Sequence, residues 1–498
     1  MSQLPAYLLD IQREIEGHGR GYGLDFWETS FEILDYRKMQ EVAAFGGFPV
    51  RYPHWRFGMD YERLMKTHTY GMGKIYELVI NNDPCYAYLL RSNSRTEHKL
   101  VMAHVYGHND FFKNNYWFSK TNRKMMDEMA NHGTHIRRHY DSFGHTPVEN
   151  FIDACLTLED LIDPNAPFRE RRAGPRSVIE EAPSETQKVP KMKAKAHMQG
   201  FINPPAFVKQ QLEKMREDVK KKKCVPEEPE KDVLKFLIEF APLEPWQRDI
   251  LTIIRDEAYY FVPQRQTKIM NEGWASYWHS RMMTHDLLTN AEFIDYADVH
   301  SSTMGSQPGV INPYKLGVEL YRHIEDRWNK GRYGSDYHNC ADLIKKRNWD
   351  KRLGEGREKV FEVRRIYNDI TFVDEFIDAE FAEAQKLFVY GFNRRTNEYV
   401  IVDRDYTKVK EKLLFSLTNF GLPYIYVTDA NFNNRNELLL QHQYTGFDLQ
   451  MDWAKDTMRN LHTLWTRPVH LETQVEGNRK RFSYDGKEYH EEFLRGEE

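Results

Sequence analysis

Apolar positions recur at helical spacing through most of the first 163 residues. Asp60 to Ile80 and Glu97 to Phe112 are two such stretches, and Gly or Asn-Asp-Pro breaks separate them from their neighbours. The same spacing returns from Val233 to about Glu383. The pattern predicts a large, mainly helical N-terminal domain built from residues 1–163 and 231–384.

The segment between these halves, residues 164–230, has a different character. It combines repeated Pro with runs of charge such as R-E-R-R-A-G-P-R and the four lysines Lys220 to Lys223. High charge and few large apolar residues are typical of exposed, weakly structured chain. We predict a solvated insertion or linker in preference to a basic patch for RNA or acidic lipid.

After Gln385 the hydrophobic period changes from helical to alternating. L-F-V-Y-G-F and E-Y-V-I-V-D-R-D predict two strands, and Val409 to Phe420 predicts a helix ended by Gly421. Two more strands, a helix over Leu449 to Leu464 and a last pair of strands follow. Residues 385–498 are therefore predicted to form a small α+β domain of order ββαββαββ, and the fold class of the whole chain is α+β.

Composition narrows the broad class of the protein. Hydrophobic residues make up 40% and charged residues 29% of the 498 residues, and the net charge of −5 gives no general attraction to nucleic acid or anionic lipid. The four cysteines are widely spaced, and no secretory leader or membrane span is recognisable. We expect a cytoplasmic protein with no nucleic-acid partner and no membrane span. P-loop, Rossmann and nucleophile-elbow motifs are also missing from the sequence.

Two histidines in the first half have the spacing of metal ligands. In T-E-H-K-L-V-M-A-H-V-Y-G-H-N-D-F-F, His104 and His108 are four positions apart and point the same way from a helix. Two imidazoles so placed suit a divalent transition metal ion, with zinc the first choice. The alternative is a pair of core histidines that only make hydrogen bonds.

The stretch I-M-N-E-G-W-A-S-Y, residues 269–277, resembles the N-E-G-F-A-S-Y-type helix of gluzincin metallopeptidases. That resemblance implies a zincin-like arrangement in which Glu272 is the third metal ligand beside His104 and His108. The match departs from the family at Val105, which stands where H-E-x-x-H has its general-base glutamate. A base other than residue 105 would then be needed for hydrolysis.

Further residues are candidates for roles around this site. Glu97, Glu77 and His279 are the candidate bases, because each lies among apolar neighbours on a predicted helix. Residues expected to support the ligands are His279, Asn109, His135 and His139.

Four longer blocks resemble the SpoVR family, the stage V sporulation protein R group. They are Y-P-H-W-R-F-G-M-D-Y-E-R-L, H-T-Y-G-M-G-K-I-Y-E-L-V-I-N-N-D-P, H-V-Y-G-H-N-D-F-F and M-N-E-G-W-A-S-Y-W-H. The resemblance implies a cytosolic bacterial protein connected with spore cortex formation, or with stress responses in bacteria that do not sporulate. It also implies a PrkA-type serine kinase and a von Willebrand-type-A-domain protein as partners.

Two functions remain open from the sequence. One is a metal-dependent enzyme, most simply a hydrolase, with one divalent ion held by His104, His108 and Glu272. The other is a non-catalytic regulatory or scaffold protein that acts with the kinase system, in which case the histidines are structural.

Overall fold

The computed structural model describes residues 4–69, 77–169, 204, 225–305 and 309–494. The chain divides into two compact units. The first unit consists of residues Met1–Asn150 and Asp256–Leu422, and the second of residues Phe151–Arg255 and Pro423–Glu498. Most of the predicted insertion, residues 164–230, lies outside the described residues.

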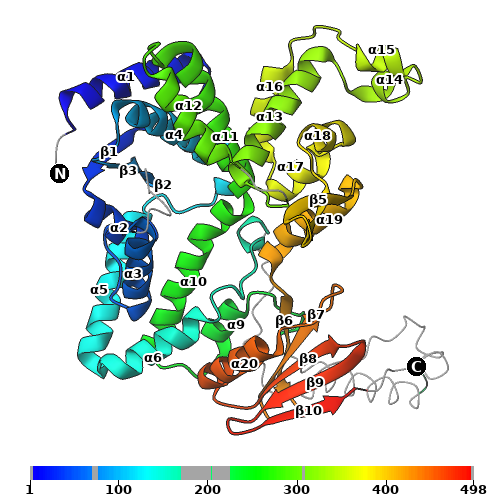
Figure 1. The fold of residues 1–498 in the computed structure, drawn as a ribbon. Coiled ribbons are helices and arrows are strands. Elements are labelled where there is room, and N and C mark those ends of the chain that lie inside the picture. The colour runs from blue at the N-terminus through cyan, green and yellow to red at the C-terminus, as the bar shows by residue number, and fades with distance from the viewer. Residues whose placement is uncertain (1–3, 70–76, 170–203, 205–224, 306–308, 495–498) are drawn as a thin grey trace, which may run out of the picture. The chain divides into compact units, whose positions relative to one another are not determined.

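Helices make up most of the first unit (Figure 1). Its first half contains α1 (Ala6–Gly21), α2 (Tyr36–Ala44), α3 (Trp55–Thr69), α4 (Arg95–Asn114), η1 (Tyr116–Phe118) and α5 (Met125–Phe143). Its second half contains α11 (Lys268–Met282), the π-helical turn η4 (Met283–Leu287), α12 (Phe293–Met304), α13 (Pro313–Lys330), α14 (Gly334–His338), α15 (Leu343–Arg347), α16 (Gly356–Ile366), α17 (Asp369–Phe376), α18 (Ala379–Ala384), α19 (Tyr406–Leu417) and η5 (Thr418–Gly421). Helices α6 (His145–Leu156) and α10 (Pro245–Gln266) contribute residues to both units.

The first half is mainly helical, as predicted, and it also contains a small mixed sheet that the sequence pattern did not predict. Strands β1 (Thr29–Leu34), β3 (Cys85–Leu90) and β2 (Glu77–Ile80) are neighbours in that order. The β1–β3 pair is parallel and the β2–β3 pair is antiparallel. These strands are only four to six residues long, so each gives too short a pattern to be distinguished from the helical stretches around it.

The main core of the first unit forms around α11. Helices α4 and α13 both pack against it, and Figure 1 shows the three side by side. Trp274 and Trp278 of α11 are fully buried in this core. Nearly all residues of α11 are buried, on every side of the helix. A helix enclosed in this way shows little amphipathic pattern.

The last part of the chain follows the order ββαββαβββ, which corrects the predicted ββαββαββ. Its elements are β4 (Val389–Asn393), β5 (Glu398–Asp403), α19, β6 (Tyr424–Phe432), β7 (Glu437–Gln443), α20 (Met451–Trp465), β8 (Val469–Val475), β9 (Asn478–Tyr484) and β10 (Tyr489–Phe493). The ninth element, β10, has the sequence Y-H-E-E-F and pairs antiparallel with β9 at the edge of the sheet. An exposed edge strand needs no apolar face, so its sequence gives little signal.

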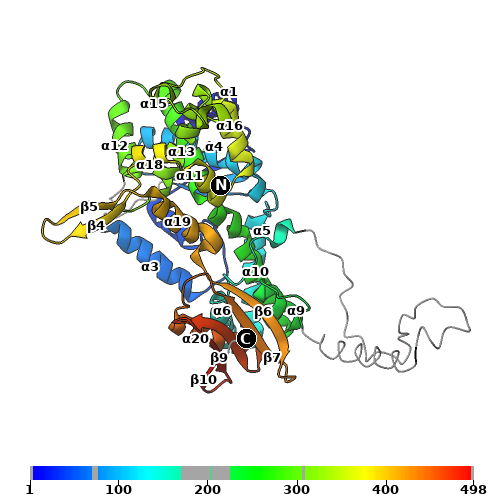
Figure 2. The same ribbon diagram turned by 90° about the vertical axis from the view of Figure 1, so that its right-hand side faces the viewer.

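These strands belong to two separate sheets. Strands β4 and β5 pair only with each other among the described residues, and Figure 2 shows this hairpin projecting from the first unit. Strands β10, β9, β8, β7 and β6 form one five-stranded sheet in the second unit, with α20 packed on it. The second unit also contains η2 (Ala166–Phe168) and α9 (Val233–Phe240), and α9 packs on β6.

The structure divides at Leu422 and Pro423, whereas the sequence pattern placed the start of the C-terminal domain at residue 385. The reason for the difference is that α19 packs against α17, and its Leu413, Leu414 and Leu417 contact the core of the first unit. A change of hydrophobic period marks a change of secondary structure, and it does not show against which core the new elements pack.

Candidate metal centre

Helix α4, whose N-terminus is capped, carries two of the site residues. Ser94 accepts a hydrogen bond from the Glu97 backbone N–H, and the Glu97 side chain accepts one from the Ser94 N–H at 2.6 Å. This capping box satisfies donors at the start of the helix. His104 and His108 follow two and three turns later and are 4% and 7% exposed. The structure therefore places Glu97 at the helix start, about 10 Å of helical rise before His104.

Helix α11 reaches this face because small residues line the contact. A Cβ atom at Gly107 would lie 2.6 Å from the Cα of Ala275, and one at Gly273 would lie 2.5 Å from the Cα of Gly317. Helix α11 is thus held closely between α4 on one side and α13 on the other. The carboxylate of Glu272, one position before Gly273, is brought to the two imidazoles by this packing.

The side chains of His104, His108 and Glu272 meet at one point. Glu272 Oε2 lies 3.5 Å from Nε2 of His104 and 3.4 Å from Nε2 of His108. Within the described part of the chain, these three residues form the one group of His, Cys, Asp and Glu side chains whose ligand atoms all lie within 4.8 Å of one another. Glu272 Oε2 is buried and has no hydrogen-bond partner among the described residues.

The other ring nitrogen of each histidine is held by a neighbour on α11. His108 Nδ1 lies 2.9 Å from Asn271 Oδ1, and His104 Nδ1 lies 2.9 Å from Nδ1 of His279. Because the amide oxygen can only accept, His108 Nδ1 carries a proton, and in the neutral ring Nε2 then keeps a lone pair. Such contacts fix the tautomer and ring orientation of histidine ligands in metal sites.

The electrostatics favour the charge states that a metal requires. Burial, assisted by the neighbouring His108, lowers the pKa of His104 to about 4, so its imidazole is neutral at pH 7. Burial by itself would raise the pKa of Glu272, but the adjacent His108 and His104 outweigh it and hold that pKa below its usual value. A neutral imidazole, as at His104, and an ionised carboxylate, as at Glu272, are the forms that bind a cation.

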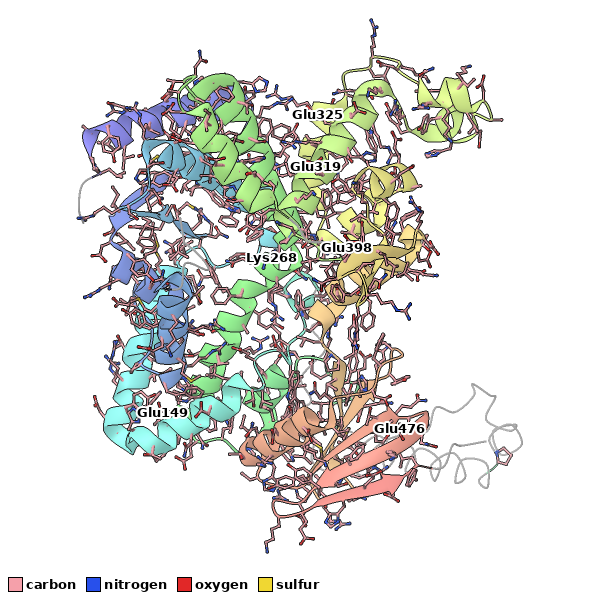
Figure 3. All side chains as sticks on the ribbon, viewed as in Figure 1. Glu149, Lys268, Glu319, Glu325, Glu398 and Glu476 are labelled. Atoms are coloured by element: carbon pink, nitrogen blue, oxygen red, sulfur yellow. The ribbon has the colours of Figure 1, made fainter. Side chains whose placement is uncertain are left out.

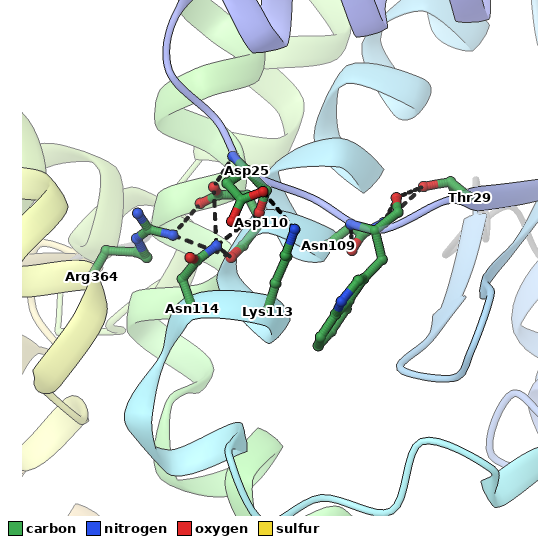
Figure 4. A network of polar contacts seen from close by, with 8 residues as sticks. Asp25, Thr29, Asn109, Asp110, Lys113, Asn114 and Arg364 are labelled. Carbon is green, nitrogen blue, oxygen red and sulfur yellow. Dashed lines mark hydrogen bonds and ion pairs between the residues drawn. The ribbon is translucent and has the colours of Figure 1, made fainter.

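A buried ion pair fixes α4 against α11 just beyond the ligands. Asp110 is fully buried and accepts hydrogen bonds from Trp274 Nε1 and from the Asp25 N–H, both at 2.7 Å. The guanidinium of Arg364, from α16, lies 3.1 Å from Asp110 Oδ2 (Figure 4). Asp25, Trp274 and Arg364, which are distant in sequence, therefore all contact Asp110, two positions after His108.

The start of α11 is held by a carboxylate about a hundred residues away. Asp369 accepts hydrogen bonds from the backbone N–H groups of Ile269 and Met270 at 2.8 and 2.9 Å. It is buried, and this burial raises its pKa to about 7. Asp369 thus caps the helix that carries Glu272, in a place where the local residue Thr267 makes no side-chain cap.

The remaining predicted site residues lie elsewhere. Asn109 faces away from the cluster, because its amide bonds to Trp27 and to the Thr29 hydroxyl (Figure 4). On α5, His135 is exposed and His139 contacts the Phe143 ring, and neither belongs to the His-His-Glu group.

Glu77 and Val105 are the two remaining positions at which a catalytic base was considered. Glu77 begins β2, and its side chain lies outside the described residues. Val105, which follows His104, is fully buried in the apolar core and has no group that could act as a base.

The comparisons with known proteins settle the family. The profile described as "SpoVR like protein" matches residues 3–422, and the profile described as "SpoVR-like C-terminal domain" matches residues 423–476. The chain belongs to the SpoVR family. The boundary between the two SpoVR matches coincides with the division of the structure after Leu422.

One curated relative of this SpoVR chain is similar over nearly its whole length. It carries the name "Uncharacterized protein YcgB", comes from Escherichia coli (strain K12), and is 28% identical over 505 residues, which cover 94% of this chain and 92% of the relative. No solved structure matches the chain. None of the helices in the described residues is both long and apolar enough to span a membrane.

Several residues of the SpoVR site were not predicted from the sequence. Asn271, Asp110, Trp274 and Asp369 all hold the ligands or their helices in place. Asn271 stood next to Glu272 in the quoted motif and could have been noticed there. Asp369 lies far along the chain, and no local sequence signal connects it with α11.

Proposed function

We propose that this SpoVR protein binds one divalent transition metal ion, most simply zinc, through His104, His108 and Glu272. The distances between ligand atoms carry the proposal. Zinc–ligand bonds of about 2.0–2.2 Å at tetrahedral angles separate two ligand atoms by about 3.3–3.6 Å. The two Nε2–Oε2 distances are 3.5 and 3.4 Å, and the carboxylate oxygen has no hydrogen-bond partner among the described residues.

We further propose that the site supports a metal-dependent hydrolysis. Three protein ligands leave one tetrahedral position open, which is the pattern of catalytic sites. A divalent ion held there would supply Lewis-acid polarisation of a carbonyl or phosphoryl group. The protein's own part is to keep Glu272 ionised and to orient the two imidazoles through Asn271 and His279.

A gluzincin-like mechanism also needs a general base beside the metal. Val105 supplies none, and Glu97 is engaged in the capping box of α4. His279 approaches His104 from the Nδ1 side, opposite to the Nε2 that faces Glu272. Glu77 remains a candidate from the sequence. A zincin-like arrangement is therefore proposed for the metal ligands and not for the base.

A second function, non-catalytic regulation, is favoured by the same missing base. In this alternative the metal, or the hydrogen-bonded cluster without it, stabilises the helical unit. The protein then acts through partners, which the family resemblance suggests are a PrkA-type kinase and a von Willebrand-type-A-domain protein in spore cortex formation or a stress response.

Metal analysis of the purified full-length chain tests the metal site directly. Protein prepared without chelators should contain about one equivalent of a transition metal, and His104→Gln and His108→Gln should each lose it. His442→Gln, which removes a buried imidazole from the second unit, should retain it. A metal content near zero in the parent, or one unchanged in the two ligand variants, would contradict the proposal. Thermal unfolding of each variant checks that loss of metal is not loss of fold.

The choice between hydrolase and regulator needs an activity measurement. The metal-loaded chain should cleave at least one of a nitrophenyl ester, an aminoacyl nitroanilide or a nitrophenyl phosphate, and the rate should follow metal content across the variants. A fully metal-loaded protein that cleaves none of them would favour the regulatory function.

A further inference from the structure

A pocket of about 260 Å³ lies in the first unit beside the C-terminal end of α11, the helix that carries Glu272. Its walls come from the end of α11, the π-helical turn η4, α12 and α13. The lining residues that matter below are Tyr277, Arg281, Tyr296, His300, Arg322 and Glu325. The size suits a small metabolite, since pockets for drug-sized ligands are about 300–1,000 Å³.

Two guanidinium groups, those of Arg281 and Arg322, share the lining with a single carboxylate, that of Glu325. Glu319, which pairs with Arg322, lies outside the lining. Glu325 Oε1 accepts from both Nη atoms of Arg281 at 3.1 Å, and its Oε2 accepts from the Tyr277 hydroxyl at 2.6 Å. The one acid of the pocket is therefore used to hold Arg281.

Arg322 is less firmly engaged. Its Nη1 donates to Glu319 at 2.8 Å, one turn earlier on α13, and its Nη2 donates to Ser280 Oγ at 3.3 Å. Glu319 and Glu325 are labelled on α13 in Figure 3. The Arg322 side chain is 45% exposed, and an exposed ion pair of this kind stabilises by only about 0–1 kcal/mol. An anion in the pocket can therefore compete for this guanidinium.

His300 adds a polar group beside Arg322. Its Nδ1 lies 3.4 Å from the Tyr296 hydroxyl, and burial lowers its pKa, which leaves the ring neutral at pH 7. A neutral imidazole with one nitrogen engaged can offer the other to a ligand. Arg322 and His300 come from α13 and α12, so a ligand between them would be held from two helices.

His279 connects the pocket wall to the proposed metal centre without opening one to the other. Its ring contacts His104 at a centroid distance of 5.1 Å and His300 at 5.9 Å. His104 turns Nε2 to Glu272 and Nδ1 to His279, and His279 in turn contacts His300 of the pocket lining. His279 is 3% exposed, and its Nε2 is buried with no partner among the described residues.

We propose that this pocket binds a small oxyanion, a carboxylate or a phosphate group, through Arg322 and His300. It is a ligand site separate from the coordination face of the His-His-Glu cluster. It does not depend on whether that cluster binds metal, so the two proposals can fail independently. Guanidinium groups pair with carboxylate and phosphate oxygens in the same bidentate geometry, which is why the two anions share one chemistry here.

Titration calorimetry on the metal-depleted full-length chain tests this site, with inorganic phosphate and succinate as separate probes at constant ionic strength. One of them should bind with one site per chain. Arg322→Gln should weaken this binding at least about tenfold, because a charge-assisted hydrogen bond is lost. His300→Gln should weaken it too. Whichever probe binds identifies the anion as phosphate or carboxylate.

Two controls separate this pocket from general charge effects and from the metal centre. Arg459 pairs with Asp456 at the same i, i+3 spacing, so Arg459→Gln is the matched substitution away from the pocket and should leave binding unchanged. His108→Gln should lose metal and keep anion binding. Binding seen only in metal-loaded protein, binding unaffected by Arg322→Gln, or no binding of either probe up to about 10 mM would each overturn the proposal.

Discussion

Gly107 of α4 and Ala275 of α11 touch backbone to backbone, and this contact lies between the two halves of the proposed metal site. An added Cβ at position 107 would lie 2.6 Å from the Cα of Ala275 and 3.2 Å from its Cβ. Gly107 immediately precedes His108, and Ala275 follows Glu272 by three positions. The separation of the two helices therefore sets the distance between the ligand atoms.

Gly107→Ala should push α4 and α11 apart and weaken both the fold and metal binding. Overpacking of this kind destabilises by about 1–3 kcal/mol. The free energy of unfolding and the metal affinity should fall together. Adding Ala275→Gly should not restore either, because the closest contact is with the Cα and not the side chain.

Gly58→Ala is the control for this substitution. Gly58 lies in α3, and nothing lies within 4 Å of an added Cβ. It should be neutral or stabilise by about 0.5–1 kcal/mol, because alanine restricts the unfolded chain and favours helix. Equal effects at the two positions would mean that helix separation does not control the site.

Asn271→Ala should lower metal affinity by about 10–100-fold, as removal of a partner of a histidine ligand commonly does. The cause is loss of the acceptor that holds His108 Nδ1 at 2.9 Å. Asn271→Asp keeps an acceptor in place and should retain most of the affinity. Competition with a chromophoric chelator measures both values. An equal loss in both variants would show that Asn271 acts through packing alone.

Arg364→Met should destabilise the first unit strongly, by about 3–5 kcal/mol, because Asp110 would remain buried without its cation. The double variant with Asp110→Asn should be less destabilised than the sum of the two single variants, since it removes both charges. Chemical denaturation of the four proteins gives this coupling energy. Additive single effects would contradict it.

Arg459→Met serves as the exposed comparison for this ion pair. Its partner Asp456 is 60% exposed, and the arginine side chain is 55% exposed. Its loss should cost less than about 1 kcal/mol.

Stability should depend on pH through Asp369. Its pKa is raised from 3.8 to about 7 in the folded protein by burial, so between these values the folded state binds the proton more tightly than the unfolded chain. The unfolding free energy contributed by this group is therefore highest below pH 4 and falls as pH rises towards 7. Denaturant titrations of the parent and of Asp369→Asn, which does not titrate, should differ by an amount that decreases over this range.

A constant difference between the two proteins from pH 4 to pH 7 would show that the Asp369 carboxyl titrates normally. In that case its two backbone hydrogen bonds at the start of α11 would compensate its burial fully.

The order of most elements after residue 385 and the His-His-Glu cluster itself were predictable from local patterns. The four-residue spacing of His104 and His108 places them on one helix face, and the N-E-G-W-A-S-Y segment pointed to Glu272. The alternation of period after residue 385 predicted eight of the nine elements there. The strands β1, β2, β3 and β10 were missed, because strands of only four to six residues give too short a pattern for their period to be recognised.

The sequence by itself determined which side chains share a helix face, because spacing along one helix is a local property. It determined neither that α11 would meet α4 nor how closely. Only the tertiary structure decided that, through Gly107 against Ala275, the buried Asp110–Arg364 pair and the Asp369 cap. These contacts join residues about 100 to 250 positions apart, and their strength comes from exclusion of water and close packing, which no local pattern encodes.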